Sequence, residues 1–147
     1  MGTDNLEIVR SLVEGMDRPD LTELFHRLEQ GDASVLAKFM PLLELLDPEI
    51  VFDVSPLEIP DLGVFRGHEG VVTFWIKWLA EWQDTSFEAS NFEDFGDHVV
   101  FDAMTHGRSR RMGANADLRQ AHLVTLRGGK AVAYRMFTNR DDALAGI

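Results

Sequence analysis

The stretch FRGHEGVVTFWIKWLAEW, residues 65–82, contains all three tryptophans of the chain. Val71, Trp75, Trp78 and Trp82 follow one another at intervals of four, three and four residues, so they share one face of an α-helix. Burying one indole ring removes roughly 150–250 Å² of surface from water, which makes this face a strong apolar signal. We therefore predict a long helix here, on which the hydrophobic core is built.

Shorter helical stripes precede this segment. Apolar residues recur at spacings of three and four residues over 6–16, 21–28 and 32–46, and each stripe predicts a helix with one buried face. Pro41 either kinks the third helix or starts a new turn within it, and Asp47-Pro48 ends it.

Strand patterns dominate the rest of the chain. Residues 50–54 predict a first strand, and residues 55–67 predict a loop. The later strands are expected at 85–95, 98–108, 117–127 and 130–139. Gly96-Asp97 and Gly128-Gly129 lie where hairpin turns need a positive φ. Helices first and strands later predict an α+β fold, in which helices pack on the concave face of a curved antiparallel sheet.

The composition fits one globular domain over residues 1–147, with 45% hydrophobic and 27% charged residues. The net charge of −11 argues against binding to nucleic acid or to an anionic membrane, both of which need a positive surface. Arg108, Arg110 and Arg111 form one local exception, either a solvated strand end or a phosphate contact. The absence of cysteine and of signal-peptide features fits a cytoplasmic protein.

Four segments, in order along the chain, carry a family resemblance. They are residues 45–50, residues 65–71 with the tryptophans that follow, residues 121–130, and residues 134–144. Together they resemble the SnoaL-like branch of the nuclear-transport-factor-2-like superfamily. The resemblance implies a cone-shaped sheet with a pocket at its wide end. The superfamily includes polyketide cyclases, ketosteroid isomerase, limonene epoxide hydrolase and scytalone dehydratase, together with binding and scaffolding domains that do no chemistry.

Strand alternation selects the polar residues that can face this pocket. In 118–126, Gln120 and His122 lie opposite the face that holds Arg119, so they point inward. We assign His122 as a candidate acid or base and Tyr134 as a candidate hydrogen-bond donor to a substrate carbonyl or oxyanion. Alternatively, His122 and Tyr134 are core residues bonded to each other or to water.

A carboxylate that could serve as a catalytic base is harder to assign from the sequence. In the superfamily an acid near the end of the first strand often serves as the base, which makes Asp53 the third candidate catalytic residue. By alternation, however, Phe52 is buried and Asp53 points away, unless a bulge turns it inward. His98, Asp102 and His106 share a strand face but lack metal-motif spacing, so we expect no metal and no cofactor.

The sequence thus predicts a small-molecule-binding domain with a mostly apolar pocket. The residues expected to contact the ligand are Phe52, Trp75, Trp78, Thr105, Gln120 and Met136. If the domain is an enzyme, we expect cofactor-free isomerisation, cyclisation or dehydration of a small apolar or polyketide-like compound. The alternative is a non-catalytic binding or scaffolding domain. In either case a homodimer is expected, through an exposed sheet face that carries Val100, Met104, Ala121 and Leu123 among charged residues.

Overall fold

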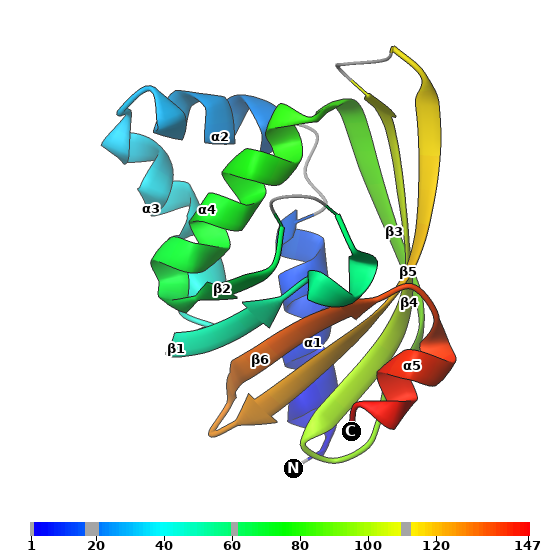
Figure 1. The fold of residues 1–147 in the computed structure, drawn as a ribbon. Coiled ribbons are helices and arrows are strands. Elements are labelled where there is room, and N and C mark those ends of the chain that lie inside the picture. The colour runs from blue at the N-terminus through cyan, green and yellow to red at the C-terminus, as the bar shows by residue number, and fades with distance from the viewer. Residues whose placement is uncertain (1, 17–20, 60–61, 110–112) are drawn as a thin grey trace.

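The computed structural model describes residues 2–16, 21–59, 62–109 and 113–147 (Figure 1). The elements are α1 (Gly2–Met16), α2 (Leu21–Glu29), η1 (Ala33–Val35), α3 (Leu36–Leu43), β1 (Leu46–Asp53), η2 (Ser55–Leu57), β2 (Val64–Arg66), α4 (Gly67–Ala80), β3 (Trp82–Asp94), β4 (His98–Ser109), β5 (Asn115–Arg127), β6 (Lys130–Phe137) and α5 (Arg140–Ala145). Here η marks a short 3-10 helix.

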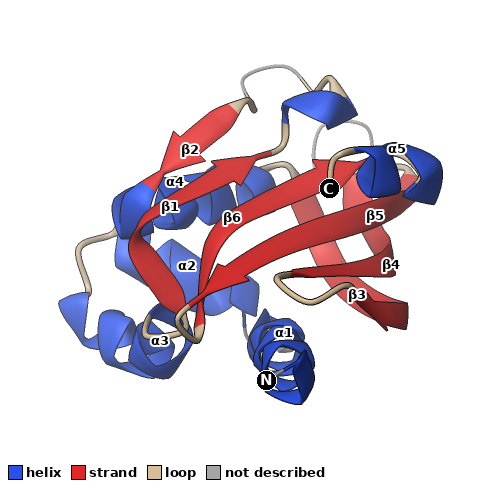
Figure 2. Ribbon diagram, turned by 90° about the horizontal axis from the view of Figure 1, so that it is seen from below, coloured by secondary structure: helices blue, strands red, loops and turns tan. Residues whose placement is uncertain are grey.

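The strands form one sheet in the order β2-β1-β6-β5-β4-β3. Neighbouring strands are antiparallel except β1 and β6, which run parallel. The sheet is curved and open, with α1 to α4 on its concave side and α5 on the outer side (Figure 2). The predicted α+β fold, with the N-terminal helices packed in the hollow of a curved sheet, is confirmed, and the parallel β1–β6 pair is an addition to it.

The helix predicted from the tryptophan stripe is α4, but its buried face passes through Phe74 rather than through the next residue, Trp75. Val71, Phe74 and Trp78 are buried, whereas Trp75 is only half-buried. The helix ends at Ala80, so Trp82 belongs to β3, although its ring still packs on Trp78 at 5.7 Å between centroids. Positions 71, 74 and 78 follow the helical period as well as the tryptophan series does, and they place Phe74 at the centre of the core.

At two positions at the start of α4, steric constraints favour glycine over residues that have a Cβ. Gly67 has a φ of +71°, a conformation that residues with a Cβ rarely adopt. A Cβ at Gly70 would lie 3.0 Å from the carbonyl carbon of Phe65, so the helix approaches β2 closely there. The His68 ring donates a hydrogen bond from Nε2 to the Leu46 carbonyl oxygen at 2.9 Å. This turn therefore joins α4 to both β1 and β2.

Two regions on either side of β1 differ from the predicted pattern of helices, strands and loops. The third helix ends at Leu43 rather than continuing to residue 46, and β1 begins at Leu46. The reason is pairing with β6, because Ala131 donates its backbone N–H to Leu45 and lies opposite Leu46. Residues 64–66, predicted as loop, form the short edge strand β2 against β1. Long-range strand pairing overrides a local helical period at residues 44–46 and a loop pattern at residues 64–66.

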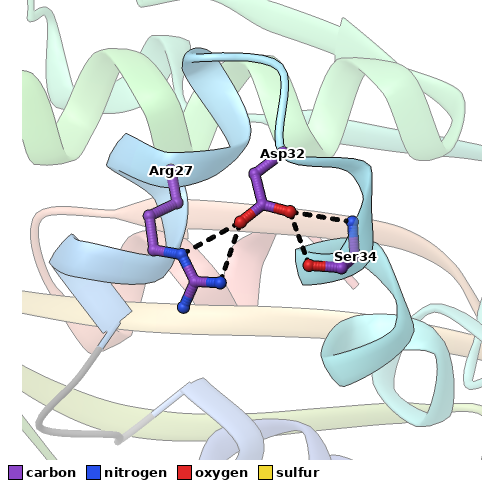
Figure 3. A network of polar contacts seen from close by, with 3 residues as sticks. All are labelled: Arg27, Asp32 and Ser34. Carbon is purple, nitrogen blue, oxygen red and sulfur yellow. Dashed lines mark hydrogen bonds and ion pairs between the residues drawn. The ribbon is translucent and has the colours of Figure 1, made fainter.

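The connection between α2 and α3 is a tight polar turn (Figure 3). Arg27 donates to one carboxylate oxygen of Asp32 from Nε at 3.1 Å and from Nη2 at 2.8 Å. The other oxygen accepts from the Ser34 backbone N–H at 3.1 Å and from the Ser34 hydroxyl. These hydrogen bonds hold the pKa of Asp32 below its usual value. Asp32 thus caps the 3-10 turn that leads into α3.

The outer face of the sheet is partly covered by α5, which corrects the predicted dimer face. Val100, Ala121 and Leu123 were expected to be exposed, but each is at most 1% exposed and packs with Ala143 of α5. Met104 is half-buried. The sequence of residues 139–147 predicts either a short helix or a frayed tail; the structure forms the helix α5, which covers the apolar surface that the sequence analysis assigned to a partner chain.

Polar contacts fix α5 in this position. Arg140 donates from Nη1 to Asp102 at 3.0 Å, and its Nη2 pairs with Glu93. The side chain of Asn139 caps the helix by accepting from the backbone N–H of Asp142 at 2.9 Å. Both acidic partners of Arg140 lie on strands β3 and β4, so the C-terminal helix is tied to the far half of the sheet.

Candidate ligand-binding site

Three polar side chains form a hydrogen-bonded chain in the interior. His122 lies on the concave face of β5, with Phe101 of β4 and Met136 of β6 as its cross-strand neighbours. Its Nδ1 is 2.6 Å from the Tyr134 hydroxyl oxygen, and its Nε2 is 2.7 Å from Oε1 of Gln120. The exposed fractions of Gln120, His122 and Tyr134 are 4%, 1% and 2%. We call these three residues the polar chain.

Aromatic rings surround the polar chain. The rings of Phe87 and Phe101 lie 5.8 and 5.0 Å from the His122 ring, and Phe52 stacks on Tyr134 at 4.9 Å. Burial in these surroundings lowers the pKa of His122 to about 3 and raises the pKa of Tyr134. Both side chains are therefore uncharged at neutral pH.

A neutral imidazole has one N–H and one acceptor nitrogen, so the polar chain has a direction. In the structure Oε1 of Gln120 faces the His122 ring. The Nε2–H of His122 therefore donates to Gln120, and the Tyr134 hydroxyl donates to Nδ1 of His122. Turning the Gln120 amide over and moving the ring proton to Nδ1 reverses every bond. In the reversed direction the Tyr134 O–H is free to donate to a ligand oxygen. The polar chain can therefore either accept or donate one hydrogen bond at Tyr134 without any group becoming charged.

The inward orientation that strand alternation predicts for Gln120 and His122 is confirmed, because both side chains are buried on the concave side. Phe52, Trp78, Thr105 and Met136 are all buried together with the polar chain, and Trp75 is half-buried with its ring 5.3 Å from that of Phe74. Whether any of them contacts a ligand stays a prediction.

Asp53 is not brought to the polar chain. One of its carboxylate oxygens accepts from the backbone N–H and the hydroxyl of Ser55 at 2.9 and 2.6 Å, and the other lies 3.9 Å from Nε of Arg135. The β1–β6 register pairs Phe52 with Tyr134 and Asp53 with Arg135. Adjacent residues point to opposite faces of a sheet, so Asp53 faces away from the concave side, and no bulge turns it inward.

The polar residues of β4 that face outward have separate partners. His98 bonds the Thr125 hydroxyl at 3.0 Å through Nδ1, whereas Asp102 accepts from Asn91 at 2.8 Å and from Arg140. His106 lies between two carboxylates, 2.6 Å from Asp117 and 3.1 Å from Glu88. Within the described ranges, no three histidine or acidic side chains are arranged to hold a metal ion.

The position of His106 predicts a pH effect. Hydrogen bonds that the His106 ring donates to Asp117 and Glu88 raise the pKa of His106, so its stabilising contribution is present below pH 6.5 and is lost as the pH rises through the folded-state value. We expect the melting temperature of His106→Gln to lie about 1–2 °C below that of the wild type at pH 6 and to match it at pH 9. Melting curves followed by circular dichroism measure this difference. His26→Gln is the control, and an equal deficit at both pH values would contradict the prediction.

Two of the hollows near the sheet are lined by residues in the described part of the molecule. The larger, of about 620 Å³, lies between α1 and β3, and we call it the α1–β3 groove. Its lining residues are Arg10, Val13, Glu14, Phe87, Glu88, Ala89, Ser90 and Phe92. The other, of about 350 Å³, lies beside His106 and Arg108 at the far end of β4 and β5. Arg110 and Arg111, the rest of the predicted basic cluster, lie outside the described residues.

The groove was not predicted from the sequence. Two of its lining residues, Phe87 and Ala89, alternate with polar residues in 85–95, which was a signal that this face of β3 is inward. The position of α1 against β3 depends on long-range packing, so the existence of a groove there could not be read from the pattern.

Among described residues, no helix has the length and apolarity needed to cross a membrane.

Solved structures with this fold are similar over most of the chain. An NTF2-like protein from Burkholderia thailandensis is 20% identical, with a TM-score of 0.67, and the match covers 96% of this chain and 94% of that one. A protein of ketosteroid isomerase-like fold from Catenulispora acidiphila, in complex with trimethylamine, is 16% identical, with a TM-score of 0.58 and coverages of 71% and 77%. TerC, co-crystallised with polyporic acid, is 20% identical, with a TM-score of 0.58 and coverages of 84% and 90%.

These TM-scores show a common fold. No functionally curated protein matches the chain. The sequence model of the SnoaL-like domain matches residues 21–134, which is more than half of the chain. With the curved six-stranded sheet and the helices in its hollow, this match shows that the chain belongs to the SnoaL-like domain family.

Proposed function

We propose that this protein binds a small, mostly apolar molecule on the concave face of its sheet, with Tyr134 of the polar chain as the hydrogen-bonding group. The observation that carries the proposal is the hydrogen-bonded set Gln120, His122 and Tyr134 among aromatic rings. Burying polar groups costs free energy that their hydrogen bonds only partly recover, and apolar residues of similar shape stabilise a core at least as well. The polar chain is therefore better explained by recognition than by folding.

The geometry favours binding over catalysis. A cofactor-free isomerisation, cyclisation or dehydration needs a base that is free to take a proton. Both nitrogens of His122 are engaged, burial lowers its pKa, and Asp53 is on the other face of the sheet. The complexes with trimethylamine and polyporic acid, seen in two structures of this fold, support a role in holding small organic molecules.

Coumarin, a flat uncharged molecule with one carbonyl oxygen, is a suitable probe. We expect coumarin to shift the ring nitrogen resonances of His122 on titration, because a ligand bond at Tyr134 changes the hydrogen bond at Nδ1. Tyr134→Phe is expected to weaken coumarin binding by roughly fivefold to tenfold, the effect of losing one hydrogen bond. NMR titration of histidine-labelled protein measures both results.

Thr73→Val is the matched control, since it removes a hydroxyl from the exposed side of α4. It should bind coumarin as the wild type does. Unchanged His122 resonances at saturating coumarin would overturn the proposal. Native mass spectrometry of freshly purified protein would then identify any other small molecule that the chain retains.

A homodimer is the second part of the proposal, and the outer face of β3, β4 and β5 beyond α5 supports it. There Met104 lies among Glu88, Asp117 and Arg119, a mixture of charges that can pair with itself across a two-fold axis. Sedimentation velocity should give twice the monomer mass, and Met104→Glu should halve it. A monomeric wild type at micromolar concentration contradicts the dimer.

A further inference from the structure

We propose that ligands reach the polar chain through the α1–β3 groove, that the Phe87 ring is the gate between groove and chain, and that the favoured ligands are uncharged flat aromatic compounds with a carbonyl oxygen. The inference rests on the proposed function and adds the access route, the gating residue and the ligand class.

Phe87 belongs to both sites. Its side chain lines the groove of about 620 Å³, and its ring centroid is 5.8 Å from that of His122, with 35° between the planes. The other aromatic residue of the groove, Phe92, instead stacks on Phe101 at 4.8 Å. Among the described residues that line the groove, Phe87 is thus the one whose ring covers the histidine. Displacing this ring joins the groove to the polar chain.

The backbone around Phe87 is favourable for such a displacement. β3 is an edge strand, paired with β4 along one side. Its register shifts between Gln83 and Ser86 and again between Ser90 and Glu93, where Asn91 has a φ of +55°. Phe87 therefore lies in a short regular segment between two irregular ones. The ring is only half-buried, so it can change rotamer without opening the sheet.

The lining of the route selects the ligand class. Val13, Phe87, Ala89 and Phe92 give the groove an apolar floor that fits a flat ring. The guanidinium of Arg10 lies over Phe92 at 5.4 Å, and the groove lining also contains Glu14, while the carboxylate of Glu88 is bound to His106 on the outer face, so the rim offers no excess positive charge to an anion. Beyond Phe87, the polar chain is uncharged and surrounded by aromatic rings. A charged ligand would lose its hydration there without gaining a counter-ion, whereas a carbonyl oxygen can accept from Tyr134.

Hydrogen exchange of the His122 ring N–H tests the gate without a ligand. We expect Phe87→Ala to accelerate this exchange with solvent by at least about tenfold, because the covering ring is gone. Phe92→Ala, which removes a ring of the same groove that does not contact His122, should change it by less than about twofold. The backbone amide of Val124, in the middle of the sheet, reports global opening and serves as the internal reference. Equal acceleration in both variants would overturn the gate.

Stopped-flow binding of coumarin tests the route. We expect Phe87→Leu, which preserves most of the packing, and Phe87→Ala to raise the association and dissociation rates together, by roughly tenfold in the alanine variant. Ala89→Trp, which fills the groove, should slow association without moving the His122 resonances of the free protein. Coumarin carboxylate should bind more weakly than coumarin to the wild type.

The outcomes separate the two proposals. If coumarin shifts the His122 resonances but the Phe87 and Ala89 variants leave its rates unchanged, the access route is wrong and the proposed function stands. If coumarin binds at rates that these variants alter but leaves the His122 resonances unchanged, the groove is a binding site and the role of the polar chain is wrong. Tighter binding of coumarin carboxylate than of coumarin would overturn the ligand class.

Discussion

Replacing Phe74 with alanine is expected to lower the free energy of unfolding by about 3–5 kcal/mol, a large part of the stability of a domain of this size. Phe74 is 1% exposed, and its ring lies within 6.0 Å of the rings of Phe52, Phe65, Trp75 and Trp78. These neighbours come from α4, β1 and β2, so they cannot close together over the space that the ring leaves. The loss therefore includes both the buried apolar surface and an unfilled cavity.

Urea unfolding followed by circular dichroism measures this loss. Phe95→Ala is the matched control, because Phe95 is 42% exposed in the β3–β4 turn. The control should change the free energy of unfolding by less than about 0.5 kcal/mol. A loss below about 1 kcal/mol in Phe74→Ala would show that the core does not depend on this ring.

The case of Phe74 also shows how far the sequence could predict the fold. The tryptophan series located the central helix and predicted that one face of it is buried, since indole rings give a strong periodic signal. The series could not give the rotation of the helix about its axis, because a face through 71, 74 and 78 fits the same period. The end of the helix at Ala80 was also hidden, because Trp82 continues the spacing from inside a strand.

The candidate site likewise contains residues whose orientation the sequence could predict and one whose orientation depends on more than the sequence pattern. Alternation along β5 alone was sufficient to place Gln120 and His122 on the concave face. The inward orientation of Tyr134 relative to β5 depends on an irregularity in the pairing of β5 with β6, and the sequence does not show this irregularity. The β5–β6 turn pairs Arg127 with Lys130 and Leu126 with Ala131, but after a register shift Val124 pairs with Tyr134. Without that shift Tyr134 would lie opposite Leu123 and would point toward α5.

The outer face was misread for a different reason. Val100, Ala121 and Leu123 were predicted to lie on an exposed face that a second copy of the chain covers, but they are buried within the chain. The cover is α5 of the same chain, a six-residue helix that packs Ala143 and Leu144 against this surface. Its position depends on Arg140 reaching Asp102 and Glu93, residues 38 and 47 positions earlier in the chain. Such a contact leaves no periodic signal in the sequence.

Acidification from pH 7 to pH 5 is expected to remove about 2 kcal/mol of stability through His122 alone. Burial lowers the pKa of His122 from 6.5 to about 3, so between these values the unfolded chain binds one proton more than the folded chain does. The free energy of unfolding therefore falls as the pH falls below 6.5, by up to about 1.4 kcal/mol per pH unit. Protonation would also leave a charged imidazole among Phe87, Phe101 and Tyr134, and among the described residues its hydrogen-bond partners are the uncharged side chains of Tyr134 and Gln120.

His122→Gln removes the titrating group and keeps a polar side chain, so it should lose less stability than the wild type between pH 7 and pH 5, whatever its stability at pH 7. Urea unfolding at the two pH values gives the difference directly, and it cancels the contribution of the carboxylates that titrate in both proteins. His106→Gln is the control of opposite sign: its histidine has a raised pKa and stabilises the wild type on acidification, so this variant should lose more. Equal losses in the wild type and His122→Gln would mean that the imidazole is reached by water or by a counter-ion. The polar chain would then not be the dry, uncharged hydrogen-bonding site on which the proposed function depends.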